Sequence, residues 1–92
     1  MGQLPTYDIE KKPFEKLNHT GKIFHALMHG AHLSPATAND IADTTEGTRF
    51  IRFIRQDGHP VETEKFKSKA GGTYYRYFFS KEQINAIKEQ LS

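Results

Sequence analysis

The chain contains no cysteine and no tryptophan among its 92 residues. Without cysteine it can form neither disulfides nor thiolate metal sites, which fits a reducing compartment such as the cytoplasm. No apolar run reaches the length that a membrane span requires, and the N-terminus lacks the apolar region of a signal peptide. We therefore expect a cytoplasmic protein that does not contact a membrane.

Neither sign of charge dominates, because 13 Lys and Arg residues face 11 Asp and Glu residues, for a net charge of +2. Such a balance does not identify a nucleic-acid-binding protein, so the positions of the basic residues matter more than their number. The chain is long enough for one hydrophobic core and too short for two. We expect an N-terminal arm over residues 1–17 and one folded domain over residues 18–92.

The first half of the domain shows three helical patterns. Asn18 or Thr20 can cap a first helix over residues 18–29, which Gly30 ends. Ser34-Pro35 is a strong start signal for a short second helix over residues 35–43. A third helix is expected over residues 46–57, before Gly58. Its expected buried side consists of Phe50, Ile51, Phe53 and Ile54.

The second half favours a β-hairpin followed by a helix. Residues 61–67 and 73–79 are rich in residues that favour strands, and Gly71-Gly72 lies in the turn between them. Ser80 and Gln83 match a capping box that opens a C-terminal helix. The expected core contains Phe24, Leu27, Ile41, Phe50 and Ile54.

This order of elements predicts an α+β fold, a winged helix-turn-helix. Three helices form the body, the second and third are joined by a short polar turn, and the hairpin is the wing. The C-terminal helix is an addition to that plan.

Four segments resemble small winged helix-turn-helix proteins of phages and prophages. They are Leu33-Ser34-Pro35, Thr48-Arg49-Phe50-Ile51, the run from Ile54 to Val61 that contains Gly58-His59-Pro60, and Tyr74-Tyr75-Arg76-Tyr77. In that family an I-x-x-L-R-x-x-G-H/Y-P-I segment joins the recognition helix to the wing. The resemblance covers about residues 22–79 and implies a DNA-binding protein in a bacterial host cell. The acidic pair Asp43 and Glu46, the arm and the C-terminal helix depart from the family pattern.

The third helix is the candidate recognition helix. Arginine forks suit guanine, glutamine suits adenine, and threonine can contact a phosphate or a thymine methyl group. Basic residues of a wing fix the register on DNA by contacting phosphates. The alternative for the helix is that its arginines only solvate an exposed face. The alternative for the wing is that its lysines discourage aggregation at a strand edge. The candidate DNA-binding residues are Thr45, Thr48, Arg49, Arg52, Gln56, Lys65, Lys67, Lys69 and Arg76.

Catalytic and metal-binding patterns are absent from the sequence. There is no G-x-S-x-G motif, no phosphate-binding loop of the Walker type and no pair of carboxylates with an evident cleft. His25 and His29 share a helix face but lack the glutamate of a metalloprotease. We expect no enzymatic activity, no cofactor and no functional metal.

Two functions follow from these patterns. The first is a phage-type transcriptional regulator or an architectural, excisionase-like factor. It would bind double-stranded DNA as a homodimer or as a cooperative multimer. The alternative is a winged-helix protein-interaction module that inhibits a host protein, such as a defence complex. The near-neutral charge, the acidic turn and the aromatic second strand favour the alternative.

Overall fold

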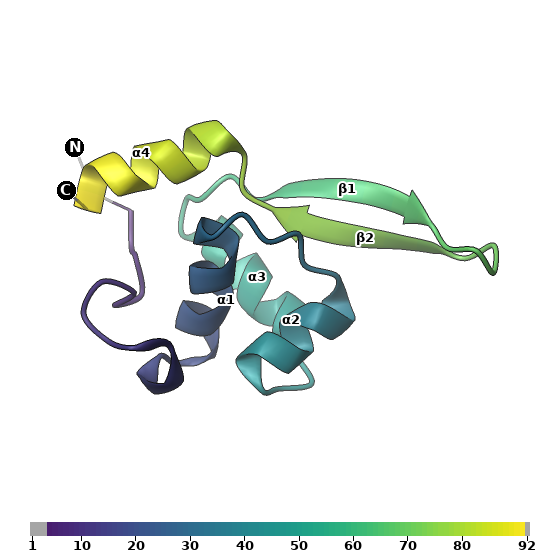
Figure 1. Ribbon diagram of the computed structural model, residues 1–92, viewed down its shortest axis with the longest axis horizontal. Helices are drawn as coiled ribbons and strands as arrows, with labels where there is room; N and C mark the ends of the chain where they lie inside the picture. The colour runs from purple at the N-terminus through teal and green to yellow at the C-terminus, as the bar shows by residue number, and fades with distance from the viewer. Residues whose placement is uncertain (1–3, 92) are drawn as a thin grey trace.

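Three short helices form the body of the molecule in the computed structural model, which describes residues 4–91 (Figure 1). An antiparallel hairpin extends from this body along the longest dimension of 44 Å, and a fourth α-helix runs back from the base of the hairpin along the top of the body. The fold is therefore α+β, in the predicted order of elements. The elements are η1 (Phe14–Lys16), α1 (His19–Met28), α2 (Pro35–Ala42), α3 (Gly47–Gln56), β1 (Glu62–Lys67), β2 (Thr73–Phe78) and α4 (Lys81–Leu91).

The predicted signals at the helix ends are confirmed. The side chains of Asn18 and Ser34 accept backbone N–H bonds in the first turns of α1 and α2, at 2.7 and 3.2 Å. Gly30 and Gly58, with φ angles of +83° and +110°, follow α1 and α3 in the left-handed conformation that favours glycine. Among residues 4–91 no helix is long and apolar enough to cross a lipid bilayer.

Only half of the predicted capping box forms at the start of α4. The Ser80 hydroxyl accepts the backbone N–H of Gln83 at 3.1 Å, as predicted. The Gln83 side chain does not return to the Ser80 backbone; its amide nitrogen lies 3.0 Å from Nδ1 of His59. The glutamine therefore joins α4 to the segment that follows α3.

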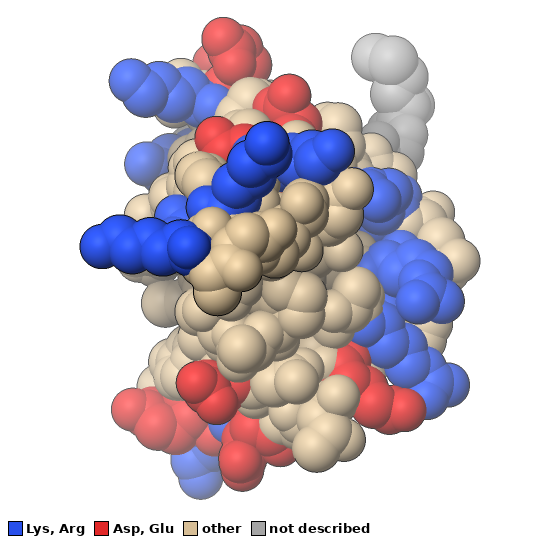
Figure 2. Space-filling view, turned by 90° about the vertical axis from the view of Figure 1, so that its right-hand side faces the viewer, with Lys and Arg blue, Asp and Glu red and all other residues tan. Residues whose placement is uncertain are grey.

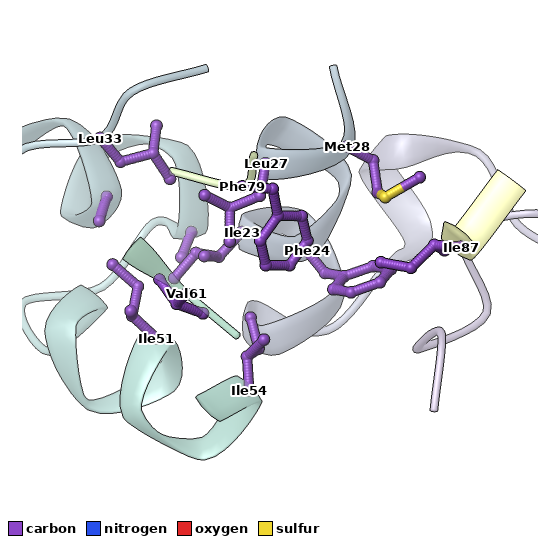
Figure 3. Close-up of a cluster of buried hydrophobic side chains, with 12 residues drawn as sticks. Ile23, Phe24, Leu27, Met28, Leu33, Ile51, Ile54, Val61, Phe79 and Ile87 are labelled. Carbon is purple, nitrogen blue, oxygen red and sulfur yellow. The ribbon is translucent and has the colours of Figure 1, made fainter. Parts of the chain in front are cut away.

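The core lies between α1, α3 and the base of the hairpin (Figure 3). Phe24, Leu27 and Ile54 are fully buried, as predicted, whereas Ile41 and Phe50 are only partly buried. Figure 3 shows Phe24 of α1 at the centre of the labelled side chains. The buried hydrophobic cluster comprises Ile23, Phe24, Leu27, Met28, Leu33, Ala38, Ala42, Ile51, Ile54, Val61, Phe79 and Ile87.

The buried side of α3 is narrower than predicted. Gly47, Ile51 and Ile54 face the core, at the i, i+4, i+7 spacing of one helix face. Phe53 was expected among them and instead is 37% exposed. At about 100° per residue, it projects roughly 130° away from the middle of the buried face. The prediction for Phe53 is wrong because hydrophobicity was given more weight than helical position.

Gly47 allows α3 to approach α2 closely. A Cβ atom built there would lie 2.7 Å from backbone atoms of Ala38 and Asn39, which is too close for any real contact. The Gly47 N–H also donates to Oδ1 of Asn39 at 2.6 Å. The glycine therefore sets the position of the first turn of α3 against α2.

Gly47→Ala is expected to lower the free energy of unfolding, although alanine is the better helix former. Overpacking typically costs about 1–3 kcal/mol, which outweighs a helix-propensity gain of about 1 kcal/mol. Gly72→Ala is the matched control, because a Cβ there lies 3.4 Å from the Ser68 hydroxyl at an ordinary φ. Urea unfolding of both variants checks this, and equal stability of the two would contradict the close approach.

The hairpin pairs Glu62 with Phe78 at its base and Lys67 with Thr73 at its tip. The connection between α1 and α2 adds a bridge on the far edge of β2. There, Leu33 and Tyr77 exchange two backbone hydrogen bonds of 2.8 Å each. These bonds hold the base of the hairpin against the helical body.

The N-terminal segment packs onto the domain instead of extending from it. The Tyr7 ring lies edge-on to Phe24, with centroids 5.0 Å apart, and its hydroxyl donates to Asp57 at 2.5 Å. The backbone N–H of Leu4 donates to Gln90 of α4 at 3.1 Å. Residues 1–3 of the predicted arm lie outside the described residues.

Candidate functional site

The exposed side of α3 carries the predicted recognition residues. Arg49, Arg52 and Gln56 are exposed and follow the i, i+3, i+7 spacing of one helix face. Thr45, in the turn before the helix, is exposed as well, and Thr48 is partly buried on the flank. The structure therefore brings the polar residues together on the side of α3 that faces away from the core.

Three arginines of α3 differ in what they contact. Arg49 pairs with Glu46 at 3.3 Å, with both side chains more than half exposed, so the pair contributes little to stability. The side chain of Arg52 makes no hydrogen bond or ion pair with any residue of the described chain. Arg55 donates to the Val61 carbonyl at 2.7 Å. Arg52 is therefore the arginine that is free to bind a ligand.

Arg55 fixes the hairpin relative to α3. Its guanidinium contacts both the Val61 carbonyl and the Thr63 hydroxyl, the latter at 3.3 Å. Thr63, Lys65 and Lys67 alternate along β1 and so project from one face of the hairpin. Because Thr63 contacts α3, this is the α3 side of the hairpin, and both lysines are exposed on it.

The opposite face of the hairpin is occupied by a stack of aromatic rings. Phe66 and Tyr74 stack with centroids 5.6 Å apart, and the Arg76 guanidinium lies 4.5 Å from the Phe66 centroid. Nearer the base, the His32 ring stacks on Phe78. Arg76 therefore lies on the other face from Lys65 and Lys67, within a cation–π contact that holds its side chain.

Lys69 lies in the turn between the two strands and is exposed. Figure 2 views the molecule from the hairpin end. Lys and Arg side chains gather in the upper half of this view and along its right-hand edge, whereas Asp and Glu lie mainly toward its top and bottom. Exposed acidic side chains also come just before α3, at Asp40, Asp43 and Glu46. Seven of the 13 Lys and Arg residues lie in α3 and the hairpin, and the other six are spread over the N-terminal segment, α1 and α4.

His59 is a buried structural residue that joins the N-terminal segment to α4. Its ring is 1% exposed, with Nε2 2.7 Å from the Pro5 carbonyl oxygen and Nδ1 3.0 Å from the Gln83 amide nitrogen. Both contacts are hydrogen bonds when the neutral ring carries its proton on Nε2, because Nδ1 then accepts from the amide. Burial lowers the pKa of His59 below its ordinary value, against the opposing effects of the Pro5 carbonyl and Asp57.

We expect His59 to make the protein less stable in mild acid. Its pKa is lower in the folded than in the unfolded state, so the unfolded state takes up more protons as pH falls below about 6.5. The contribution of neutral His59 to the free energy of unfolding is complete above that pH and is lost as pH falls toward the folded-state pKa. Urea unfolding of wild type and His59→Gln from pH 8 to pH 5 checks this. Equal pH dependence of the two proteins would contradict it.

His25 and His29 stack on one another with centroids 4.3 Å apart. His29 Nδ1 lies 2.9 Å from the His25 carbonyl oxygen. Among residues 4–91, no three His, Asp or Glu side chains are grouped so that they could hold a metal ion.

An open groove of about 560 Å³ lies between the N-terminal segment, the end of α1 and α4. Its lining is largely apolar, with Ile9, Met28, Ile84 and Leu91 among the lining residues. None of the candidate DNA-binding residues lines it. The groove is therefore a separate surface from that of α3 and the hairpin.

Phe53 is the residue of this surface that the sequence analysis did not include. It lies one turn from Arg49 and beside Arg52, within the exposed stripe of α3. Placing Gly47, Ile51 and Ile54 on one helix face would have found it, because the opposite face then contains Phe53.

Comparisons with known proteins add no information about this site. No protein-family model matches the chain, and no match was found among the curated proteins or the solved structures. What the site can do is therefore argued from the chemistry of α3 and the hairpin alone.

Proposed function

We propose that this protein is a winged helix-turn-helix DNA-binding protein of the phage type. It acts as a transcriptional regulator or as an architectural, excisionase-like factor in a bacterial host cell. Helix α3 is the recognition helix and enters the major groove, and the hairpin is the wing and contacts the adjacent phosphates. The protein binds double-stranded DNA as a homodimer or as a cooperative multimer.

One observation carries this proposal: the unpaired Arg52 and the exposed Lys65 and Lys67 lie on one side of the molecule. Arg55 joins the two elements that present them. A helix face and a basic strand held at a fixed angle suit a duplex, whose groove edges and phosphates lie at fixed relative positions. The low net charge is no obstacle, since non-specific affinity depends on the phosphates actually contacted.

A gel-shift titration against mixed-sequence duplex DNA, at low and at moderate salt, tests the proposal. We expect binding at low salt that weakens steeply as salt increases, because bound lysines and arginines release counterions from the DNA. Lys88→Ala is the matched control, since Lys88 is exposed on α4, away from α3 (Figure 1). Absence of binding at low salt would refute the proposal.

Lys67→Ala is expected to weaken binding to all duplex sequences alike. A lost phosphate contact lowers the slope of log affinity against log salt by about 0.9, without changing sequence preference. The same experiment on Lys65→Ala and Lys69→Ala shows which lysines contact phosphates. An unchanged slope in all three variants would mean that the hairpin does not contact the DNA backbone.

The second candidate function is inhibition of a host protein through the other face of the hairpin. The partly buried rings of Phe66 and Tyr74 and the stacked Arg76 favour a protein partner on that face. Under this alternative, weak DNA binding would not respond to changes at Arg49 and Arg52. When the protein is immobilised on a column, the wild type should retain a host protein that the Tyr74→Ala variant does not retain.

A further inference from the structure

Phe53 is a large apolar side chain at the edge of the polar surface of α3, next to the partly buried Phe50. It is 37% exposed, and the core face of α3 is complete without it. Arg49 and Arg52 lie beside it on the helix, and Gln56 follows one turn later. The exposed part of this ring offers an apolar contact within the surface that carries Arg52 and Gln56.

The Phe53 ring is held in place before any ligand binds. Phe50 meets it edge-on, with centroids 5.8 Å apart and planes at 77°. The Arg49 guanidinium carbon lies 5.7 Å from its centroid. Phe50 itself packs against the core and against His19. The ring is therefore presented from a packed support, so that little conformational freedom is lost on binding.

We infer that Phe53 is a specificity-determining residue that reads the C5-methyl group of a thymine in the major groove. This inference rests on the proposed function, in which α3 enters that groove. Thymine alone presents a methyl group there, and apolar side chains contact it. Wedging between stacked bases is typical of minor-groove binders and does not suit a helix in the major groove.

The neighbours of Phe53 complete the expected recognition pattern. Arg52 reads a guanine, because a free guanidinium matches the O6 and N7 acceptors. Gln56 suits adenine. The preferred duplex therefore contains a thymine whose methyl group faces α3, next to the base pairs that these residues contact.

Replacing single thymines by deoxyuridine tests this inference, because the change removes the methyl group and keeps the hydrogen-bonding edge. A preferred duplex is first selected from a randomised pool with the wild-type protein. Each thymine is then replaced in turn, and affinities are measured for wild type, Phe53→Ala and Phe53→Leu. At one position the wild type should lose about fourfold in affinity, the equivalent of one buried methyl group.

The variants should show whether Phe53 is the residue that contacts the thymine methyl group. Phe53→Ala should bind the thymine and deoxyuridine duplexes equally at that position, whereas Phe53→Leu should keep part of the difference. Lys88→Ala should respond as the wild type does. Thermal unfolding of Phe53→Ala should resemble that of the wild type, since the side chain lies outside the core.

The outcomes against the inference are distinct from failure of the proposed function. If the duplex is bound but no thymine replacement matters, or Phe53→Ala keeps the wild-type response, the inference is overturned and DNA binding stands. If no duplex is bound at low salt, the proposed function fails and the inference fails with it. In that case the exposed ring would belong to a protein interface.

Discussion

Replacing Phe24 with alanine is expected to lower the free energy of unfolding by about 3–5 kcal/mol. The side chain is fully buried, and the rings of Tyr7, His59 and Phe79 surround it at centroid distances of 5.0, 4.8 and 5.6 Å. The cavity left behind would lie where the N-terminal segment, α1 and the end of the hairpin meet. Small domains are marginally stable, so this is a large part of the total.

Phe53→Ala is the matched control for this prediction, because it makes the same chemical change on an exposed helix face. It should cost less than about 1 kcal/mol, as surface substitutions usually do. Each kcal/mol lowers the melting temperature of a domain of this size by about 4–8 °C. Thermal unfolding should therefore separate the two variants clearly, and similar melting temperatures would mean that the core is not centred on Phe24.

Loss of both Arg49 and Arg52 is expected to have the largest effect on DNA binding. Both residues lie in the first two turns of α3, the part of a recognition helix that reaches base edges. Each bidentate contact to a base is worth about 1–3 kcal/mol, which corresponds to about 5- to 150-fold in affinity. On the preferred duplex Arg49→Ala/Arg52→Ala should lose most of its specific affinity and approach its binding to mixed DNA.

The single variants should differ in a way that the structure determines. Arg52 has no ion pair within the described chain, whereas Arg49 must leave Glu46 before it can contact DNA. We therefore expect Arg52→Ala to lose more affinity than Arg49→Ala. Glu46→Ala should bind slightly more tightly than wild type, because it frees Arg49 and removes a negative charge. Unchanged affinity in the folded double variant would favour the protein-interaction function.

Local signals in the sequence determined the order and the ends of the elements. Asn18, Ser34 and the glycines after α1 and α3 act on the backbone within a few residues, so their effect can be read without the fold. The strand composition and the glycine-containing turn predicted the hairpin in the same way. The exposed polar side of α3 also followed from sequence, because helical spacing fixes which residues share a face.

Tertiary structure decided which apolar residues form the core and which polar residues share one surface. Phe53 and Ile51 are similar in hydrophobicity, and the rotation of α3, with Gly47 packed closely against α2, exposes one and buries the other. The Gln83 side chain bonds to His59 instead of the helix end because α4 packs against a segment distant in sequence. Likewise, the contact of Arg55 with Thr63 and the pairing of Arg76 with Glu64 place Lys65 and Lys67, but not Arg76, on the α3 side of the hairpin. Such contacts join residues that are far apart along the chain, so the patterns within single elements could not predict them.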